Sequence, residues 1–298
     1  MKDFTLSVYR NLLQTLKYKD YEFLTVEEYF TRQVASSQGR SLASSLPRSL
    51  VLLRHDVDRK PENALRMAKL EAVLGVKATY YFRTIPQTLK PDIIKQIAEL
   101  GHEIGYHYEN LTTANSQIKN LNPVKYSRSS NFTGQKCKIK NEEEYEKELF
   151  ELAIKDFEKN LNKLRKIVPI KNICMHGSPL SKWDSRDLWG KYNYRDYGII
   201  SEPYFDIDFS KVQYITDAGR SWNNAAINLR DKVNSPFENN FKHTNNIIKA
   251  AENGQLSEQT MFNIHPEHWA ATSPEWLKIW TVRKVKNAVK RVVLRRRP

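Results

Sequence analysis

LVLLRHDVD, residues 50–58, is an apolar run that ends in two carboxylates separated by one residue. In a β-strand successive side chains alternate between two faces, so Arg54, Asp56 and Asp58 share one face. A strand that is apolar almost throughout is buried on both faces, and active sites form where such strands end in parallel sheets. Two acids at the end of such a strand can have different roles, because one can bind a metal while the other accepts a proton. The same acids would also suit a turn that caps a helix starting near Pro61.

The segments after this strand alternate between helix and strand patterns. Residues 62–75 and 91–101 have helical periodicity and end at glycine, whereas residues 76–84 and 102–109 have the composition of strands. The order β-α-β-α-β is typical of a parallel sheet covered by helices. Further strands are predicted near residues 170–176, 197–203, 212–219 and 260–266.

This alternation predicts an α/β protein built on an irregular (β/α)7-type barrel, a distorted TIM barrel. An open doubly wound sheet is the alternative, although no glycine-rich phosphate loop follows any strand. We expect the barrel to span residues 46–275, between an N-terminal helical extension over 1–45 and a basic amphipathic C-terminal helix or tail over 276–298. The polar stretch 111–141 is predicted to form a long loop or lid, and residues 141–167 a long helix.

The composition is that of a globular protein, with 298 residues of which 40% are hydrophobic and 28% charged. No stretch has the run of about twenty apolar residues that a membrane span needs, and the N-terminus lacks the pattern of a signal peptide. Cys137 and Cys174 are too few for a disulfide framework. These observations predict a cytoplasmic protein.

The net charge of +14 is distributed unevenly along the chain. Residues 281–298 hold eight basic residues and no acidic one, which leaves +6 for the remainder. The valines of this segment follow helical spacing, and a basic amphipathic helix can lie peripherally on an anionic membrane surface, here the inner membrane. The alternatives are a solvated basic tail or a helix packed on the body. Nucleic acid is not an expected partner, because the chain has no zinc-finger spacing, nucleic-acid motif or basic-aromatic stripe.

Polar side chains follow several of the predicted strands at the point where each strand ends. His107 and Glu109 share a face at the end of the third strand, while His102 falls on the opposite face and is interpreted as a turn residue. Three later strands deliver, in order, His176, Asp217 and His265. Because the carboxyl ends of parallel strands meet at one edge, we expect these groups to converge in space.

The motifs RHDVD, ATYYF, GHEIGYH, ITDAGRSW and NIHP, in this order between about residues 50 and 270, resemble those of the NodB-homology polysaccharide deacetylases, carbohydrate esterase family four. That resemblance implies a metal-dependent hydrolase that removes acetyl groups from amino sugars on an irregular (β/α) barrel. It implies that Asp56 is the catalytic base, Asp58 the metal-binding carboxylate and His107 the first metal histidine. The RHDVD form of the first motif resembles a branch that acts on peptidoglycan, lipid-linked sugars and surface polysaccharides.

The resemblance also assigns roles on the opposite side of the expected site. His265 matches the general acid, Asp217 the carboxylate that orients and charges it, and Trp222 an aromatic wall of the acetyl pocket. Tyr108, Glu109 and Arg220 are further candidates for substrate contacts.

Two departures from the family pattern are visible in the sequence. The family usually has a second metal histidine four residues after the first, where this chain has Leu111. Glu109 and His176 are the candidate replacements, and we favour His176 because imidazole suits zinc, although it could instead only bind substrate. The arginine that usually pairs with the base is also missing, and Arg54 could supply that charge to Asp56.

The sequence therefore predicts a hydrolase that deacetylates an N-acetylated sugar in surface polysaccharide biosynthesis, such as O-antigen or capsule assembly. The expected cofactor is a divalent metal, with zinc as the first choice, and the expected substrate is a nucleotide-linked or lipid-linked amino sugar. The alternatives are a related amide hydrolase or deformylase that acts on a lipid-linked sugar, and a catalytically inactive sugar-binding homologue.

Overall fold

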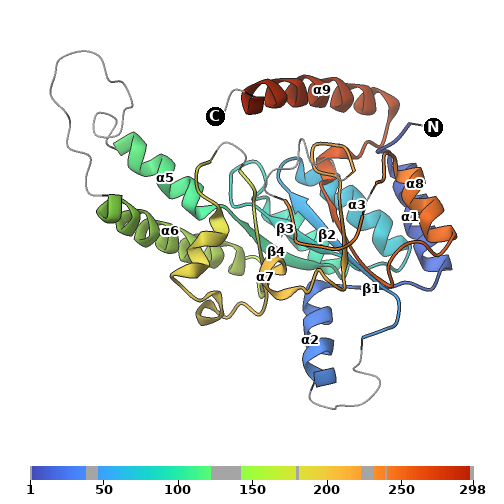
Figure 1. Cartoon of the computed structure of the whole chain (residues 1–298), viewed down its shortest axis with the longest axis horizontal. Helices are drawn as coiled ribbons and strands as arrows, with labels where there is room; N and C mark the ends of the chain where they lie inside the picture. Colours follow the sequence, from blue (N-terminus) through green and yellow to red (C-terminus); the bar gives the residue numbers. More distant parts are fainter. Residues whose placement is uncertain are drawn as a thin grey trace.

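The computed structural model describes residues 2–37, 46–121, 142–178, 181–222, 231–238 and 240–295. Its centre is one parallel sheet of seven strands (Figure 1). The strands are β1 (Glu22–Leu24), β2 (Leu50–Val57), β3 (Thr79–Phe82), β4 (Glu103–Tyr108), β5 (Ile173–Met175), β6 (Gln213–Thr216) and β7 (Gln259–Ile264). Their spatial order is β5-β4-β3-β2-β7-β6, with β1 beside the first residues of β2.

Strand β2 is the central element of this sheet. All of its residues are buried, as expected for a strand that is apolar on both faces. Its first half pairs with β1 and its second half with β3, while β7 pairs along the opposite side. The LVLLRHDVD segment therefore lies at the middle of the sheet, with its two acids at the carboxyl end.

The sheet separates two apolar cores. The larger core lies between the sheet and the surrounding helices, and includes Val51, Leu53 and Phe262. The smaller core includes Leu52 and Met261, whose side chains point to the other face. Because the sheet encloses this second core on one face, it is curled. The two edge strands, β5 and β6, are not joined by hydrogen bonds in the described part of the chain. The predicted irregular barrel is thus an α/β barrel that is incompletely closed.

The helices follow the predicted alternation. Pro61 and Pro91 occupy the first turns of their helices, and Gly75 (φ 65°) and Gly101 (φ 89°) follow their ends in the left-handed conformation that glycine tolerates. The α-helices are α1 (Leu6–Tyr18), α2 (Val26–Ser37), α3 (Pro61–Val73), α4 (Pro91–Glu99), α5 (Asn110–Leu121), α6 (Glu142–Arg165), α7 (Pro203–Asp206), α8 (Thr244–Glu252) and α9 (Ser273–Arg295). Short 3₁₀ turns are η2 (Ser185–Gly190), η3 (Tyr194–Tyr197) and η4 (Pro266–His268). No helix in these described ranges is long and apolar enough to cross a bilayer.

Two predicted segments differ from the structure. The first part of the expected loop 111–141 is helix α5, because Leu111, Ala114 and Ile118 recur at helical spacing and are buried; residues 122–141 lie outside the described residues. The strand expected near 197–203 is a single bridge from Ser201 to Asn172, after which α7 begins.

The predicted N-terminal extension contributes to the same body as the barrel. Leu12, Leu13 and Leu16 of α1 are buried in the larger core, and β1 joins the sheet. A bridge from Thr5 to Ala270 further connects the start of the chain to the segment after β7. The boundary at residue 45 remains a prediction.

Gly105 of β4 offers a test of the packing inside the barrel. A Cβ atom at this position would collide with the ring of Tyr81 and lie 3.1 Å from the carbonyl oxygen of Asn172. We expect Gly105→Ala to lower the free energy of unfolding by about 1–3 kcal/mol, as is typical of overpacking. Gly190→Ala is the matched control, because a Cβ at Gly190 meets nothing within 4 Å. Equal denaturant midpoints for the two variants would contradict this account.

Candidate active site

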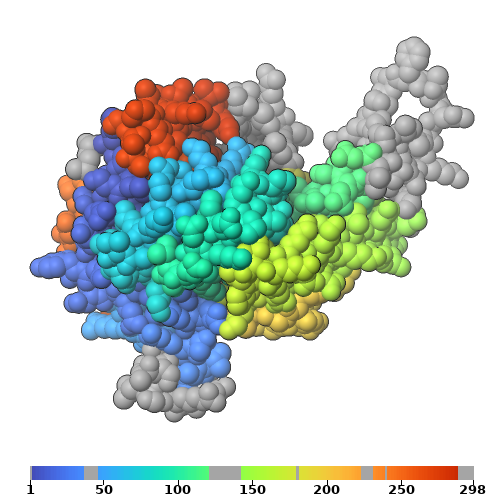
Figure 2. All heavy atoms as spheres, turned by 180° about the vertical axis from the view of Figure 1, so that it is seen from behind, coloured from blue at the N-terminus to red at the C-terminus, as the bar shows by residue number. Residues whose placement is uncertain are grey.

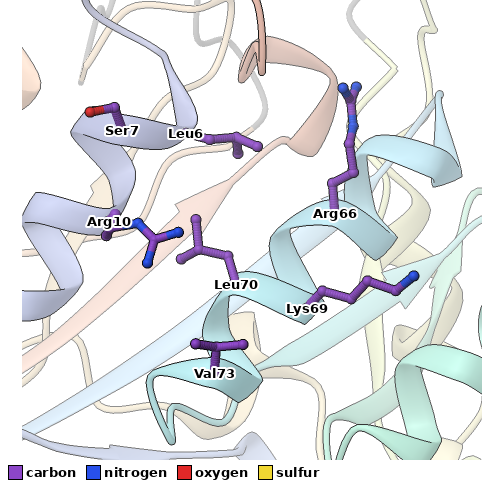
Figure 3. A pocket seen from close by; sticks show the side chains of 7 residues that line it. All are labelled: Leu6, Ser7, Arg10, Arg66, Lys69, Leu70 and Val73. Atoms are coloured by element: carbon purple, nitrogen blue, oxygen red, sulfur yellow. The ribbon is translucent and has the colours of Figure 1, made fainter.

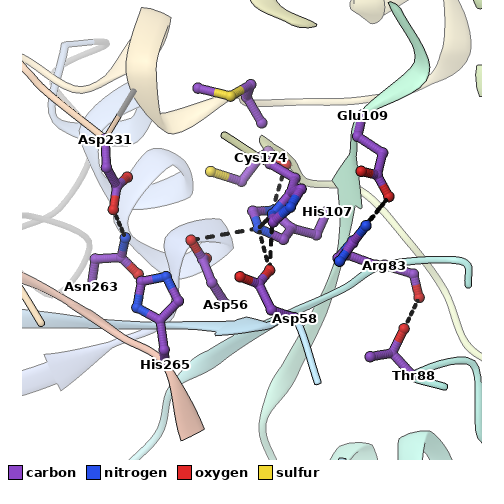
Figure 4. A network of polar contacts seen from close by, with 12 residues as sticks. Asp56, Asp58, Arg83, Thr88, His107, Glu109, Cys174, Asp231, Asn263 and His265 are labelled. Carbon is purple, nitrogen blue, oxygen red and sulfur yellow. Dashed lines mark hydrogen bonds and ion pairs between the residues drawn. The ribbon is translucent and has the colours of Figure 1, made fainter. Parts of the chain in front are cut away.

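The polar groups predicted at the strand ends do converge at one edge of the sheet (Figure 4). Asp56 lies on β2 and His107 on β4, two strands away. Two strand spacings amount to about 10 Å in a flat sheet, yet His107 Nε2 is 3.6 Å from Asp56 Oδ2. The curl of the sheet thus brings side chains from non-adjacent strands together.

Arg54 and Asp56 form a buried bidentate ion pair. Arg54 Nε donates to Asp56 Oδ1 at 2.8 Å, and Nη2 donates to Oδ2 at 2.6 Å. Burial alone would raise the pKa of Asp56, but the charge and hydrogen bonds of Arg54 hold that pKa below its usual value. The pair that the sequence predicted therefore fixes an ionised Asp56 in one orientation.

Asp58, His107 and His176 form a three-residue cluster beside Asp56. Asp58 Oδ1 is 2.9 Å from His176 Nδ1 and 3.4 Å from His107 Nε2, and these two nitrogens are 3.2 Å apart. Three ligands around a tetrahedral zinc ion lie about 3.3 Å apart. The spacing and the mixed nitrogen and oxygen donors therefore fit a divalent metal.

The tautomer of His107 supports this assignment. His107 Nδ1 lies 2.9 Å from the carbonyl oxygen of Cys174. A carbonyl oxygen only accepts, so Nδ1 carries the hydrogen and Nε2 presents its lone pair to the cluster. Asp58 Oδ1 is buried and faces the ring nitrogens of His176 and His107. Electron-rich atoms that face one another at such distances are stabilised by a cation between them.

Two other groups of possible ligands are less suited to a metal. One combines Asp56 and His107 with Cys174. In this group Arg54 already binds both oxygens of Asp56. Burial also raises the pKa of the Cys174 thiol well above its usual value, which disfavours the thiolate that a metal needs. The other combines Asp217, His265 and His268, where the carboxylate already pairs with a histidine and an indole. The Asp58 cluster is therefore the best candidate for a metal centre.

Asp217 and His265 form a second unit on the other side of Asp56. Asp217 Oδ1 lies 2.7 Å from His265 Nδ1 and also accepts the backbone N–H of His265, while Oδ2 accepts the indole N–H of Trp269 at 2.9 Å. Burial alone would lower the pKa of His265, but the hydrogen bond and the charge of Asp217 raise that pKa to about 10. His265 is therefore a cation at neutral pH, held in one orientation.

Asp231 and Trp269 belong to the site but were missed by the sequence reasoning. Asp231 accepts the side-chain N–H of Asn263 at 2.9 Å and lies 3.8 Å from Arg54 Nη2. Asn263 could have been found, because it lies on β7 two residues before His265, and residues two apart along a strand share a face. Asp231 had no such signal, since no predicted strand leads to it.

The predicted substrate residues lie outside this cluster. Tyr108 is on the helix-facing side of β4, where its hydroxyl donates to Glu202 at 3.3 Å. Trp222 is buried against Phe4 and Trp269, one layer behind the Asp217 carboxylate. Their roles toward a substrate remain predictions.

Arg220 and Glu109 also have partners of their own. The guanidinium of Arg220 lies over the rings of Phe4 and Trp276, at 5.2 and 5.0 Å. The carboxylate of Glu109 is paired with Arg83 at 2.5 Å, which leaves His176 as the better third ligand.

His102 lies on the opposite face, as predicted, and is buried against α3. Its Nε2 is 3.0 Å from the carbonyl oxygen of Ala68, and the ring lies near Glu71. A surface groove of about 520 Å³ between α1 and α3 also lies in this helical layer (Figure 3), with Leu6, Arg10 and Leu70 among its lining residues. Neither feature reaches the strand ends where the site is located.

The Asp217–His265 pair makes a prediction for pH. Because the pKa of His265 is raised to about 10, the stabilisation from its protonation is complete below about pH 6.5 and is lost as the pH rises toward 10. Asp217→Asn should lower the pKa of His265 by several units, which NMR titration of the imidazole would measure. A wild-type imidazole that titrates near pH 6.5 would refute the assignment.

Comparisons with known proteins give matches in structure alone. No protein-family model matches the sequence, and no curated protein matches it. The chain is similar to a family-four (CE4) pseudoenzyme from Bacillus anthracis, with 11% identity and a TM-score of 0.37, over 80% of this chain and 61% of that one. It is also similar to a CE4 esterase from Streptococcus mutans, with 13% identity, a TM-score of 0.37 and 82% coverage of each chain.

This chain spans about three fifths of the length of the pseudoenzyme structure. At a TM-score of 0.37 the likeness assigns no activity, substrate or catalytic residue to this chain. Both of these solved structures are of carbohydrate esterase family four.

Proposed function

We propose that the protein is a metal-dependent amide hydrolase that removes the acetyl group from an N-acetylated sugar. The observation that carries this proposal is the order of groups along the sheet edge. A cluster suited to a metal, Asp58 with His107 and His176, lies on one side of the fixed carboxylate Asp56. A histidine that is protonated at neutral pH, His265, follows the strand on the other side of β2.

This order matches the needs of amide hydrolysis. A divalent metal held by Asp58, His107 and His176 would polarise the acetyl carbonyl and lower the pKa of a water molecule. Asp56, ionised and oriented by Arg54, accepts the proton of the attacking water. His265 donates a proton to the leaving amine, which otherwise is a poor leaving group.

The substrate and its setting are part of the same proposal. We infer an amino sugar of surface polysaccharide assembly, such as O-antigen or capsule, presented on a nucleotide or lipid carrier at the cytoplasmic side of the inner membrane. The motif resemblance and the basic C-terminal helix support this setting. Hydrolysis of a formyl or another acyl group is the nearest alternative, because it would use the same residues around a pocket of different size.

An inactive sugar-binding protein is the second candidate. It is favoured by Leu111, which occupies the position of the family's second metal histidine and is fully buried. The retained Asp56, Asp217 and His265 argue against it, since mere sugar binding has no need for a paired base and acid.

Metal content and acetate release test the proposal directly. The purified protein should bind about one equivalent of zinc, and Asp58→Ala and His176→Ala should each lose it, because each change removes one of three ligands. Glu109→Gln is the control and should retain the metal, since Arg83 already engages Glu109. With metal bound, acetate should be released from UDP-N-acetylglucosamine or a polyprenyl-linked N-acetyl sugar.

Three outcomes would change the assignment. Metal loss in Glu109→Gln alone would move the third ligand to that residue. Metal binding without release of acetate, but with release of formate from an N-formyl sugar, would favour the deformylase. Sugar binding with no metal at all would favour the inactive protein.

Arg54 gives a test of the catalytic carboxylate that is separate from metal binding. Arg54→Lys keeps the charge but loses the bidentate geometry, so we expect kcat to fall by about 10- to 100-fold while the zinc content is unchanged. Steady-state kinetics with parallel metal analysis would measure both. Unchanged activity in Arg54→Leu would exclude a role for Arg54 in positioning Asp56.

A further inference from the structure

Helix α9 lies along one side of the body (Figure 1) and contacts the segments that follow Asp217 and His265 in the chain. Arg283 of α9 donates to Glu267 at 2.7 Å, two residues after His265. Asn287 donates to the carbonyl oxygen of Gly219 at 2.9 Å, two residues after Asp217. The helix is therefore attached to the body at the edge of the site.

The beginning of α9 is fixed as well. Glu275 pairs with Arg66 at 2.7 Å, and the indole N–H of Trp276 donates to the carbonyl oxygen of Asp3 at 2.5 Å. Ile279, which is 5% exposed, lies on the same side. Positions 275, 279, 283 and 287 recur every four residues and define the face of α9 that contacts the body.

The opposite face of α9 is exposed and carries apolar side chains on either side of Thr281. Leu277, Thr281 and Val285 follow the same four-residue spacing, and the side chains of Leu277 and Val285 are 57% and 60% exposed. Trp280 and Val282 beside them are 37% and 46% exposed. Half of the eight large hydrophobic residues that are exposed in the described part of the chain lie on this one helix, so the apolar surface is concentrated there.

The charges around this face are all positive. Over Trp276–Asn287, the part of the helix whose side chains the structure describes, there are four basic residues and no acidic one. Lys278 and Lys284 are exposed beside the apolar face, and Lys284 Nζ lies 4.5 Å from the centre of the Trp280 ring. The one acidic residue of α9, Glu275, is engaged by Arg66.

We propose that α9 docks the protein on an anionic membrane surface, with Leu277, Thr281 and Val285 in the headgroup region and the lysines at lipid phosphates. An exposed stripe that carries apolar side chains and is flanked by cations is typical of a helix that lies in the plane of a membrane interface, and basic residues near an anionic surface add attraction. An anionic membrane complements this face, because its acidic phosphate groups lie above an apolar acyl layer.

This placement has a consequence for the site. Figure 2 shows α9, in orange-red, covering one end of the molecule above segments of the N-terminal third. Since the body-facing side of α9 contacts the loops of Asp217 and His265, docking would hold the rim of the site beside the lipid headgroups. Membrane binding itself does not depend on the proposed deacetylation, so the two can fail independently.

Co-sedimentation with vesicles tests the docking face. The metal-free full-length chain should bind vesicles of phosphatidylglycerol and phosphatidylcholine, and should bind pure phosphatidylcholine vesicles at least tenfold more weakly. The double variant Leu277→Ser with Val285→Ser leaves the charge unchanged and should weaken binding at least tenfold, because the apolar contact is lost. Val34→Ser with Val73→Ser is the matched control, since these exposed valines lie on α2 and α3, and it should bind like the wild type.

Thermal unfolding of the two double variants checks that both remain folded. Equal vesicle binding by the Leu277/Val285 variant and the control would overturn the proposal, because attraction would then be electrostatic alone. It would also be overturned by binding to duplex DNA without binding to vesicles. A dimer that dissociates in the Leu277/Val285 variant, again without vesicle binding, would show that a second copy of the chain covers this face.

Discussion

The buried ion pair between Arg54 and Asp56 is the constraint on which the site depends. Moving an isolated charge of this kind into a low-dielectric interior costs on the order of 20 kcal/mol in the idealised case, so each partner requires the other. Both lie on β2, two residues apart, and the period of the strand places them on the same face. Asp231 and the ring of Tyr204, 4.9 Å from the guanidinium, complete the surroundings of Arg54.

This pair also separates the apolar interior of the barrel from its polar end. Leu50 and Leu52 precede it on the same face and belong to the inner core, while Asp58 follows it and joins the histidine cluster. In sequence order, this face of the strand thus supplies apolar core residues, then the buried ion pair, and then a residue of the proposed metal cluster. The curl of the sheet then brings His107 and residues beyond it within reach, which a flat sheet would not do.

Much of this arrangement was predictable, because a strand has only two faces. The alternation in RHDVD predicted the Arg54–Asp56 contact, and the polar ends of five strands predicted the convergence. The same alternation places Tyr108 on the face opposite to His107, because the two residues are adjacent in the strand. Its role as a substrate contact stays a prediction.

Other features could not be read from the pattern. Asp231 reaches Arg54 from outside any predicted strand, and its position depends on the folded path of the chain. Trp222 was assigned from family resemblance, whereas its place behind Trp269 follows from packing of the N-terminal Phe4, a contact across more than 200 residues. Helix α5 was missed because its polar residues outnumber the few buried apolar ones that define its period.

The structure thus supports a divalent metal centre built from two strand ends and the segment after β5, beside a fixed carboxylate. A crystal structure of the zinc-loaded protein, with anomalous scattering at the zinc edge, tests this claim most directly. We predict one strong peak bound by Asp58, by His107 through Nε2 and by His176 through Nδ1. A peak at Asp217, His265 and His268, or no peak within reach of Asp58, would contradict the account.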